Sequence, residues 1–286
     1  MIDRLFDDVK NLVNGKNIFI TGGTGTFGHK LTDILLNHYS PNKLIIFSRD
    51  EFKQYNMKQI YPEHKYPNIR YFIGDVRDYE RLLVATKDVD VLFHAAAMKQ
   101  VDTVEYNPFE AIKTNIIGAN NLIEASLKNN VKNVLALSTD KACSPINLYG
   151  ATKLCSDKLF ISANNYSGKN KTIFSVVRYG NVMGSRGSVI PFFLSLKDKS
   201  TLPITNLKMT RFMISLEEGV KLVLEAFDDM IGGEIYVKKI PSMKVTDIAK
   251  AINNKAKLKV IGLRPGEKIH EQMISPDESS YTYEYK

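Results

Sequence analysis

The 286-residue sequence contains only two cysteines and lacks any apolar run as long as the roughly 18 residues of a membrane-spanning helix. Cys143 and Cys155 are too few for a disulfide framework, so a reducing cytoplasm is the expected location. The opening segment, MIDRLFDDVKNLVNG, carries acidic side chains early and has no apolar core, which argues against a secretion signal. We expect a short amphipathic helix there and no association with a membrane.

Acidic residues are outnumbered, because 39 Lys and Arg against 31 Asp and Glu leave a net charge of +8. Such an excess suits anionic ligands. The basic residues are scattered, without a polybasic block or a nucleic-acid motif, so phosphorylated small molecules are expected as partners and nucleic acid is not. With 44% hydrophobic and 24% charged residues, the composition excludes a fibrous or wholly disordered chain.

Short apolar runs alternate with helix-like segments through the first part of the chain. The runs expected to form buried strands are NIFIT (17–21), KLIIF (43–47), IRYFI (69–73), VDVLF (89–93), VKNVLAL (131–137) and 172–177. Helical spacing of apolar residues marks 27–39, 79–86, 109–129 and 148–164. Strands that alternate with helices are joined by right-handed crossovers, so the sequence predicts an α/β protein with a doubly wound parallel sheet, a Rossmann fold.

The alternation stops near residue 187, beyond which prolines become more frequent and the elements are mixed. We therefore assign residues 1–187 to a dinucleotide-binding domain that carries the catalytic residues, and 188–286 to a smaller substrate-binding lobe. No linker rich in glycine, serine or proline separates them. The boundary is soft, and some strands or helices are expected to be exchanged across it.

A glycine-rich turn follows the first expected strand and opens a helix. In TGGTGTFG (21–28) the glycines have the spacing G-x-x-G-x-x-G, a variant of the dinucleotide-binding fingerprint. Such a loop lets the backbone approach a pyrophosphate, and the free N–H groups at the start of the helix attract it. The cofactor-binding residues expected in this loop are Gly22, Thr24, Gly25, Thr26, Phe27 and Gly28.

The end of the second strand indicates which dinucleotide binds. The hydroxyl of Ser48 and the guanidinium of Arg49 suit the 2′-phosphate of NADP, and Lys53 adds positive charge. Asp50 could instead accept a ribose hydroxyl, which keeps NAD as the less favoured cofactor. After the next two strands, the residues expected beside the cofactor are Asp75, Val76 and Ala95.

Tyr149 and Lys153 lie one helical turn apart, shortly after the sequence Ser-Thr-Asp-Lys at 138–141. A lysine beside a phenol favours the phenolate and lowers the pKa of the tyrosine from about 10. Tyr149 is therefore a candidate general base for a sugar or alcohol hydroxyl. His94 has no second ligand at a zinc-like spacing, so no metal site is expected.

These motifs resemble those of the extended short-chain dehydrogenases/reductases. The resemblance rests on the glycine turn, GDVRD (74–78), HAAAMKQV (94–101), STDKA (138–142), INLYGATK (146–153), RYGNVMGSRGSV (178–189) and RPGEKIHE (264–271). The chain is more closely similar to the short, soluble, inverting UDP-N-acetylglucosamine 4,6-dehydratases in FSRDEFKQ (47–54), STDKACSPINLYGATKLCSDKLF (138–160) and IPSMKVTDIAKA (240–251). The similarity extends from about residue 17 to residue 278.

The resemblance implies a lyase that removes water from UDP-N-acetylglucosamine and inverts C5. Tyr149 would deprotonate the C4 hydroxyl while hydride leaves for NADP, and Thr139 would hydrogen-bond that hydroxyl. Asp140 would protonate the departing C6 hydroxyl, and Lys141 would take the C5 proton. The hydride then returns to C6 and C5 is protonated from the opposite face, so a tightly bound NADP is recycled.

The resemblance also implies the substrate contacts and the assembly. The expected substrate-binding residues are Lys99, which also lies near the cofactor, and Thr139, Asn181, Val189, Thr205, Arg211, Arg264 and Glu267, with Arg186 in the same segments. Arginines can bind a diphosphate through paired hydrogen bonds, and Glu267 could accept from the uridine ribose. A homo-oligomer, either a dimer or a hexamer, is expected.

Other functions stay open on the sequence alone. A retaining 4,6-dehydratase would use the same fold without inverting C5. A UDP-sugar 4-epimerase would need Tyr149 and Lys153 but not the Asp140-Lys141 pair. A regulatory protein that only senses NADP is disfavoured, because it would have no need of the intact tyrosine–lysine pair.

Overall fold

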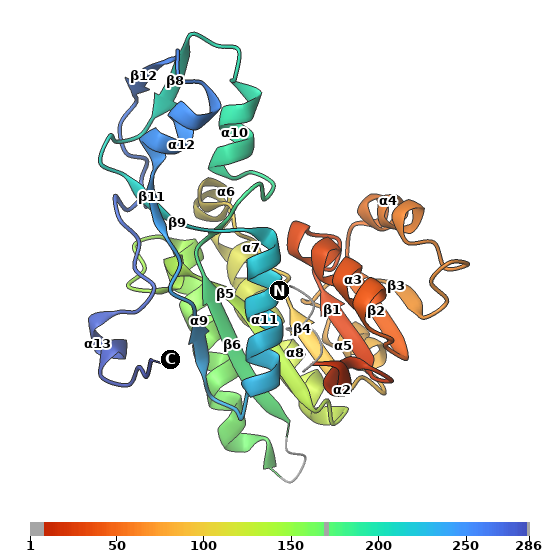
Figure 1. The fold of residues 1–286 in the computed structure, drawn as a ribbon. Coiled ribbons are helices and arrows are strands. Elements are labelled where there is room, and N and C mark those ends of the chain that lie inside the picture. The colour runs from red at the N-terminus through yellow and green to blue at the C-terminus, as the bar shows by residue number, and fades with distance from the viewer. Residues whose placement is uncertain (1–8, 169–171, 285–286) are drawn as a thin grey trace.

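The computed structural model describes residues 9–168 and 172–284. Its centre is a seven-stranded sheet in the order β10-β6-β5-β4-β1-β2-β3, in which every neighbouring pair is parallel (Figure 1). The strands are β1 (Asn17–Thr21), β2 (Lys43–Ser48), β3 (Ile69–Ile73), β4 (Val91–His94), β5 (Asn133–Thr139), β6 (Ile173–Tyr179) and β10 (Ile235–Val237). The predicted doubly wound parallel sheet is confirmed.

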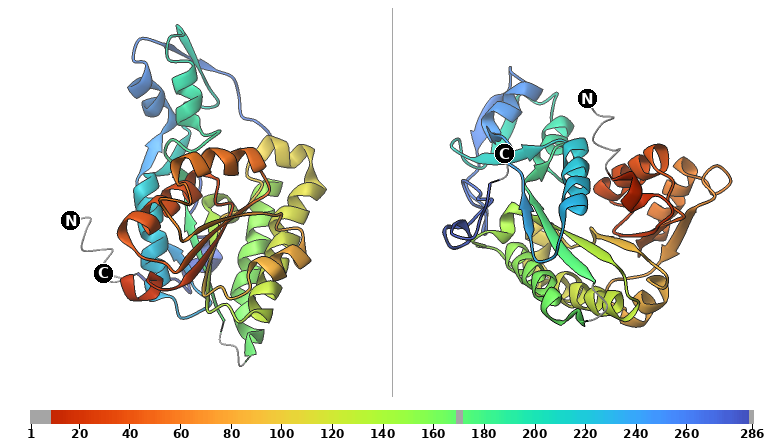
Figure 2. Two further views of the ribbon diagram at one scale, coloured as in Figure 1. Left: turned by 90° about the vertical axis from the view of Figure 1, so that its right-hand side faces the viewer. Right: turned by 60° about the horizontal axis from the view of Figure 1, so that its bottom comes forward.

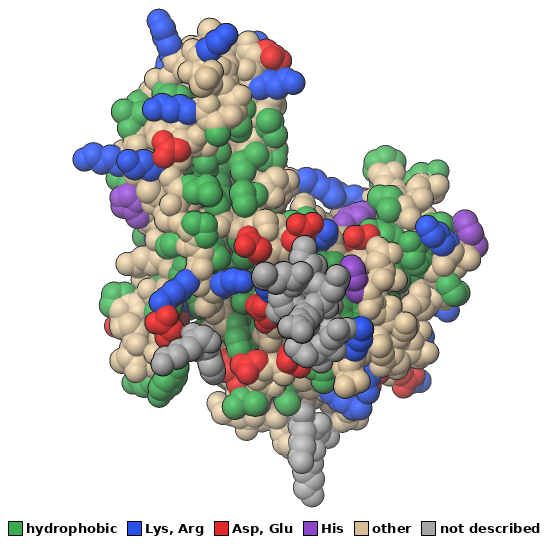
Figure 3. Space-filling view, viewed as in Figure 1, with side chains coloured by type: hydrophobic (Ala, Val, Ile, Leu, Met, Phe, Trp, Pro, Cys, Tyr) green, Lys and Arg blue, Asp and Glu red, His purple; other side chains and the backbone are tan. Residues whose placement is uncertain are grey.

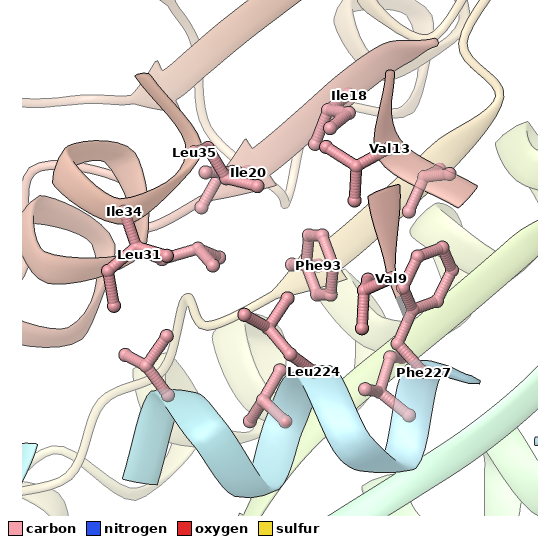
Figure 4. Packing of buried hydrophobic residues seen from close by; sticks show 14 of the residues in the cluster. Val9, Val13, Ile18, Ile20, Leu31, Ile34, Leu35, Phe93, Leu224 and Phe227 are labelled. Carbon is pink, nitrogen blue, oxygen red and sulfur yellow. The ribbon is translucent and has the colours of Figure 1, made fainter. Parts of the chain in front are cut away.

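Both faces of this sheet are covered, which explains why its strands are apolar almost throughout. In β1, Ile18 and Ile20 pack into the core on one face, and Phe19 packs into the core on the other. The first face is covered by α2 (Lys10–Val13), α3 (Thr26–His38) and α11 (Leu216–Asp229), whose apolar side chains meet in Figure 4. The second is covered by α5 (Tyr79–Ala85), α8 (Gly118–Lys128) and α9 (Leu148–Ala163), with α8 and α9 side by side in Figure 2.

Two strands begin two residues later than predicted, at Val91 and Asn133. The apolar residues ahead of them, Val89 and Val131, are buried in the core beneath α5 and α8 rather than paired in the sheet. Their backbone N–H groups instead close turns. Burial, not strand pairing, accounts for their apolar character.

The segment 109–129, predicted as one helix, consists of α7 (Pro108–Ile112), one turn of π-helix (Lys113–Ile117) and α8. The wider turn carries Asn115 toward the loop after β4. There its side chain accepts a hydrogen bond from the Met98 amide at 2.8 Å and donates one to the Met98 carbonyl at 2.9 Å. The interruption therefore fixes the backbone of the HAAAMKQV segment.

Helix α4 (Glu51–Ile60) was not predicted, because only Gln54 and Met57 are buried and no apolar stripe marks it. Of the amphipathic helix expected at the start of the chain, residues 1–8 lie outside the described residues, and α2 follows them. Among the described residues, no helix combines the length and the apolar character that a membrane span requires.

The strand order reverses at β1, which has β2 on one side and β4 on the other. At such a switch point the connections leave in opposite directions and open a crevice at the carboxyl ends of the strands. Thr21 ends β1, His94 ends β4 and Thr139 ends β5 at this same edge. The fold thus brings together three motifs that are distant in the sequence.

A smaller lobe stands beyond this edge of the sheet (Figure 1). Strand β8 (Thr201–Ile204) pairs in parallel with β12 (Lys257–Val260), and α10 (Val189–Ser195) and α12 (Val245–Ile252) enclose a separate core with them. Between the lobe and the large sheet lies a three-stranded sheet in the order β11-β9-β7.

The chain passes between these parts more than once. Strand β7 (Asn181–Val182) pairs with β9 (Thr210–Ile214), which pairs in turn with β11 (Ser242–Lys244). Helix α11 and strand β10 lie later in the chain but pack on and extend the large sheet. Segments from both sides of residue 187 therefore build the large sheet with its helices and the three-stranded sheet, whereas the core of the small lobe comes from residues after 187.

Candidate active site

The predicted catalytic residues and the glycine turn gather along the carboxyl edge of the large sheet. Figure 3 shows the surface hollowed between the small lobe and the part of the molecule that carries α3 and α4. A pocket of about 610 Å³ lies beside the glycine turn and is lined by Thr26, His29, Gly184 and Arg186, among others. Arg186 also donates to the Thr24 carbonyl at 3.2 Å, which ties the segment after β7 to the glycine turn.

The glycine turn has the geometry that its spacing predicts. Gly22 has a φ of +64°, and a Cβ there would lie 2.9 Å from the backbone of Ala95 and Ala96. The Gly25 amide closes the turn on the Gly22 carbonyl at 2.8 Å, and a Cβ on Gly28 would lie 2.3 Å from the Gly23 carbonyl oxygen. No side chain caps the N-terminus of α3, so its first N–H groups are available to a pyrophosphate.

At the end of β2, the acidic side chain is already engaged. Asp50 caps α4 by accepting from the Lys53 amide at 2.9 Å, and it forms an ion pair with the Lys53 ammonium at 2.6 Å. These hydrogen bonds lower the pKa of Asp50. Ser48 is buried and accepts from Gln54 Nε2 at 3.2 Å, whereas the side chain of Arg49 is 58% exposed.

Asp75, at the end of β3, binds two arginines. Arg77 holds its carboxylate from Nε at 3.0 Å and from a terminal nitrogen at 2.7 Å, and Arg49 lies 3.6 Å away. The hydrogen bonds and charges of these arginines outweigh desolvation and lower the pKa of Asp75. Val76 is buried against Gly118, so its side chain supports the floor of the site.

The end of β5 carries the candidate acid and base. Asp140 is fully buried, and its Oδ1 accepts hydrogen bonds from Thr139 Oγ1 and Lys141 Nζ, each at 3.0 Å. Asp140 Oδ2 is buried without a hydrogen-bond partner. Burial of a carboxylate oxygen without a donor is costly, so this atom is suited to bind a substrate hydroxyl.

Tyr149 and Lys153 project from α9 beside this turn, and both are buried. The expected lowering of the tyrosine pKa is wrong for this environment. Desolvation raises the pKa of Tyr149, and Asp140 and Asp157 add to the rise, while a hydrogen bond with Thr139 opposes it. Desolvation also lowers the pKa of Lys153, which Asp157 opposes. Burial outweighs the effect that the sequence pattern suggested.

His94 is a packed residue at the end of β4. Its Nδ1 lies 2.8 Å from Thr21 Oγ1 within hydrogen-bond distance, and desolvation lowers its pKa to about 3. Among residues 9–168 and 172–284, no group of three or more His, Cys, Asp and Glu side chains could hold a metal ion.

A buried ionic network behind the tyrosine and lysine was not predicted from the sequence. Asp157 accepts from Ser138 Oγ at 2.7 Å, and Arg178 lies 3.5 Å from it. Arg178 is 1% exposed and donates twice to Glu278, each time at 2.9 Å. The position of Asp157, one helical turn beyond Lys153, could have revealed it, but nothing local connects residue 278 with residue 178.

The expected substrate residues fall into groups. Arg264 pairs with Glu267 at 2.8 Å and with Asp102 at 3.4 Å, while Asn147 donates to the Gly266 carbonyl at 2.8 Å, so this segment reaches the start of α9. Desolvation lowers the pKa of Lys99. The nearby positive charges of Arg186 and Lys141 lower it further.

Other expected substrate residues have internal contacts. Arg211 is buried and donates to the carbonyls of Thr210 and Ile269, at 2.7 and 3.2 Å. Asn181, on β7, has a buried Oδ1 without a hydrogen-bond partner. Val189 packs against the core of the small lobe, and Thr205 hydrogen-bonds Met209 there.

Comparison with known proteins identifies the family. Residues 18–286 match the family described as polysaccharide biosynthesis protein. The chain belongs to this family. It is 60% identical to the inverting UDP-N-acetylglucosamine 4,6-dehydratase of Campylobacter jejuni strain 81-176, over 96% of this chain and 82% of that protein. The resemblance that the motifs indicated is confirmed.

One further relative and one solved structure are similar to this chain over most of its length. The chain is 46% identical to a UDP-glucose 4-epimerase of Rickettsia bellii, over 92% of this chain and 79% of that protein. The X-ray structure of Pen from Bacillus thuringiensis matches with a TM-score of 0.91 and 41% identity, over 96% of this chain and 88% of that one. The family fold therefore extends over almost the whole chain.

The contact between α9 and the turn of Asp140 and Lys141 depends on Gly150, where a Cβ would lie 2.1 Å from the Lys141 carbonyl oxygen. Gly150→Ala should therefore lower the free energy of unfolding by about 1–3 kcal/mol, as in other overpacked sites. Chemical denaturation measures this. The matched control is Gly219→Ala in α11, where a Cβ would meet nothing within 4 Å. This variant should be as stable as the unchanged protein or more stable. Equal stabilities for both variants would contradict the close approach.

Proposed function

We propose that this protein is a UDP-N-acetylglucosamine 4,6-dehydratase that inverts C5, giving UDP-2-acetamido-2,6-dideoxy-β-L-arabino-hexos-4-ulose. The observation that carries the proposal is the hydrogen-bonded pair of the buried Asp140 and the partly exposed Lys141, beside Thr139 and Tyr149. An acid and a base in contact are what a water elimination needs, in addition to the base that starts oxidation at C4. The 60% identity to an enzyme of that name supports the same conclusion.

The residues at the switch point fit a nicotinamide dinucleotide. The glycine turn packs closely against the backbone after β4, where a Cβ at Gly22 would clash, and the uncapped start of α3 suits the pyrophosphate. When bound, the dinucleotide would accept the hydride from C4 and return it to C6, so no redox equivalent is consumed. Thr24, Thr26 and Phe27 would border the pyrophosphate, with Lys99 and Ala95 toward the reacting end.

We favour NADP over NAD. Asp50 is engaged by the N-terminus of α4 and by Lys53, which leaves its carboxylate poorly placed to accept from a ribose hydroxyl. The exposed guanidinium of Arg49 and the hydroxyl of Ser48 can both serve a 2′-phosphate. Asp75 orients Arg49 from the neighbouring strand.

Tyr149 would act on the C4 hydroxyl. Its buried position raises its pKa, so the phenol would release its own proton to solvent before the phenolate takes the proton of the C4 hydroxyl. Thr139 is the hydrogen-bond partner that opposes this rise, and Lys153 supplies positive charge on the same helical face. Desolvation lowers the pKa of that lysine, and the neighbouring Asp157 opposes the lowering and so favours the charged form.

Asp140 and Lys141 would carry out the elimination. Their hydrogen bond of 3.0 Å provides a direct path for one proton between Nζ and Oδ1. With the proton on Asp140, the pair consists of a carboxylic acid and a neutral amine. The amine would take the C5 proton, the acid would protonate the C6 hydroxyl that leaves as water, and the pair returns to its ionic form.

A 4-epimerase is the second candidate, because one relative at 46% identity carries that name. Epimerisation needs the chemistry of Tyr149 at C4 but no proton transfer at C5. A retaining dehydratase would use Asp140 and Lys141 without delivering a proton to the opposite face of C5. A homo-oligomer, dimer or hexamer, and a cytoplasmic location stay predictions.

Substitution of the base separates these candidates. Lys141→Met should reduce formation of the 6-deoxy-4-keto product by about 100-fold or more, because the C5 proton then has no acceptor. Product formation from UDP-N-acetylglucosamine is measured by NMR, with Lys158→Met on the outer part of α9 as the control. A Lys141→Met protein that interconverts the gluco and galacto sugars as fast as the unchanged protein would identify an epimerase.

Cofactor choice can be tested at Arg49. Arg49→Leu should weaken NADP binding about 10- to 100-fold, since a charge-assisted hydrogen bond contributes about 1.5–3 kcal/mol. NAD, which lacks the 2′-phosphate, serves as the internal control and should bind with unchanged affinity. Calorimetric titration of the cofactor-free protein measures both. Parallel losses for the two dinucleotides would argue against a 2′-phosphate contact.

A further inference from the structure

Glu271 is a buried carboxylate that lies against the candidate base. It follows the RPGEK segment, and its side chain is only 3% exposed. Its Oε1 forms an ion pair with Lys141 Nζ at 3.6 Å. This ion pair is separate from the hydrogen bond that Lys141 makes with Asp140. The lysine thus lies between two buried carboxylates, one from its own turn and one from the C-terminal part of the chain.

The surroundings of Glu271 keep its side chain in place. Lys268 Nζ lies 3.7 Å from Oε2 and also donates to the Cys143 carbonyl at 2.7 Å, just after the turn that carries Lys141. Oε2 itself has no hydrogen-bond partner, so Glu271 depends on these two cations for compensation of its buried charge. The neighbouring His270 is within hydrogen-bond distance of Thr210, at 2.8 Å, which anchors the segment to β9.

We infer that Glu271 is a positioning residue that holds Lys141 Nζ in place for proton abstraction at C5. This inference rests on the proposed dehydratase function. Elimination would then involve two carboxylates, those of Asp140 and Glu271, and one amine, that of Lys141. Only Asp140 and Lys141 would touch the substrate.

The effect is specific to one step of the reaction. Lys141 acts on C5 only in the elimination step, and the carboxylate of Glu271, 3.6 Å from Nζ, holds the flexible lysine side chain in its place beside Asp140. Oxidation at C4 places no new charge on Lys141. Removal of the Glu271 charge should therefore slow elimination and leave the preceding hydride step almost unchanged.

The test is Glu271→Gln, which keeps the shape and removes the charge. Turnover of UDP-N-acetylglucosamine should fall about 10- to 100-fold, because misplacing a reacting group by about 1 Å can cost about 100-fold in rate. Rapid mixing with substrate should still produce the near-ultraviolet absorbance of reduced nicotinamide at the unchanged protein's rate, and that absorbance should then persist. Substrate deuterated at C5 should show a larger isotope effect on turnover than in the unchanged protein.

Controls separate this role from a structural one. Glu284→Gln removes an exposed carboxylate of the same C-terminal segment and should change neither turnover nor the absorbance transient. Glu271→Asp keeps the charge and should restore part of the lost turnover. The inference is overturned if Glu271→Gln turns over within twofold of the unchanged protein, or if its hydride step and its elimination slow together.

The unchanged protein distinguishes failure of this inference from failure of the proposed function. If it forms no 6-deoxy-4-keto product, the proposed dehydratase function is wrong. If it forms the product and Glu271→Gln forms it equally fast, only the role of Glu271 is wrong.

Discussion

The site depends on one close approach, that of helix α9 to the turn after β5. Gly150 permits it, because its backbone packs directly beneath the Lys141 carbonyl. The same contact puts Tyr149 beside Asp140 and Thr139, so the proposed base for C4 and the proposed pair for C5 and C6 lie close together. A second close approach, of Gly22 to the backbone after β4, brings the glycine turn to the same edge of the sheet.

Burial governs the chemistry of this site more than individual charge pairs do. Asp140, Tyr149, Lys153 and Asp157 are all at most 9% exposed. Desolvation accordingly favours the neutral forms of Tyr149 and Lys153. A hydrogen-bonded Asp140-Lys141 pair is well suited to such a site, because moving one proton converts two charges into none.

Much of the fold and part of the site follow from the sequence. Strands buried on both faces, such as β1, and the glycine turn have local patterns that predict them. Helix α4 has no apolar stripe, and the π-turn at Lys113–Ile117 leaves no periodic signal, so neither could be foreseen. Contacts of Glu271 with Lys141 and of Glu278 with Arg178 join residues 100 or more positions apart, and only tertiary packing brings them together. The sign of the Tyr149 pKa shift was missed because it depends on burial.

The most direct test of inverting dehydration is an NMR time course of the purified protein with UDP-N-acetylglucosamine in deuterated water, without added cofactor. The account predicts a 6-deoxy-4-keto sugar with the L-arabino configuration and solvent deuterium at C5. It also predicts that the reaction proceeds on the dinucleotide that the protein retains. A product of the D-xylo configuration alone would contradict inversion, and the galacto isomer alone would contradict dehydration.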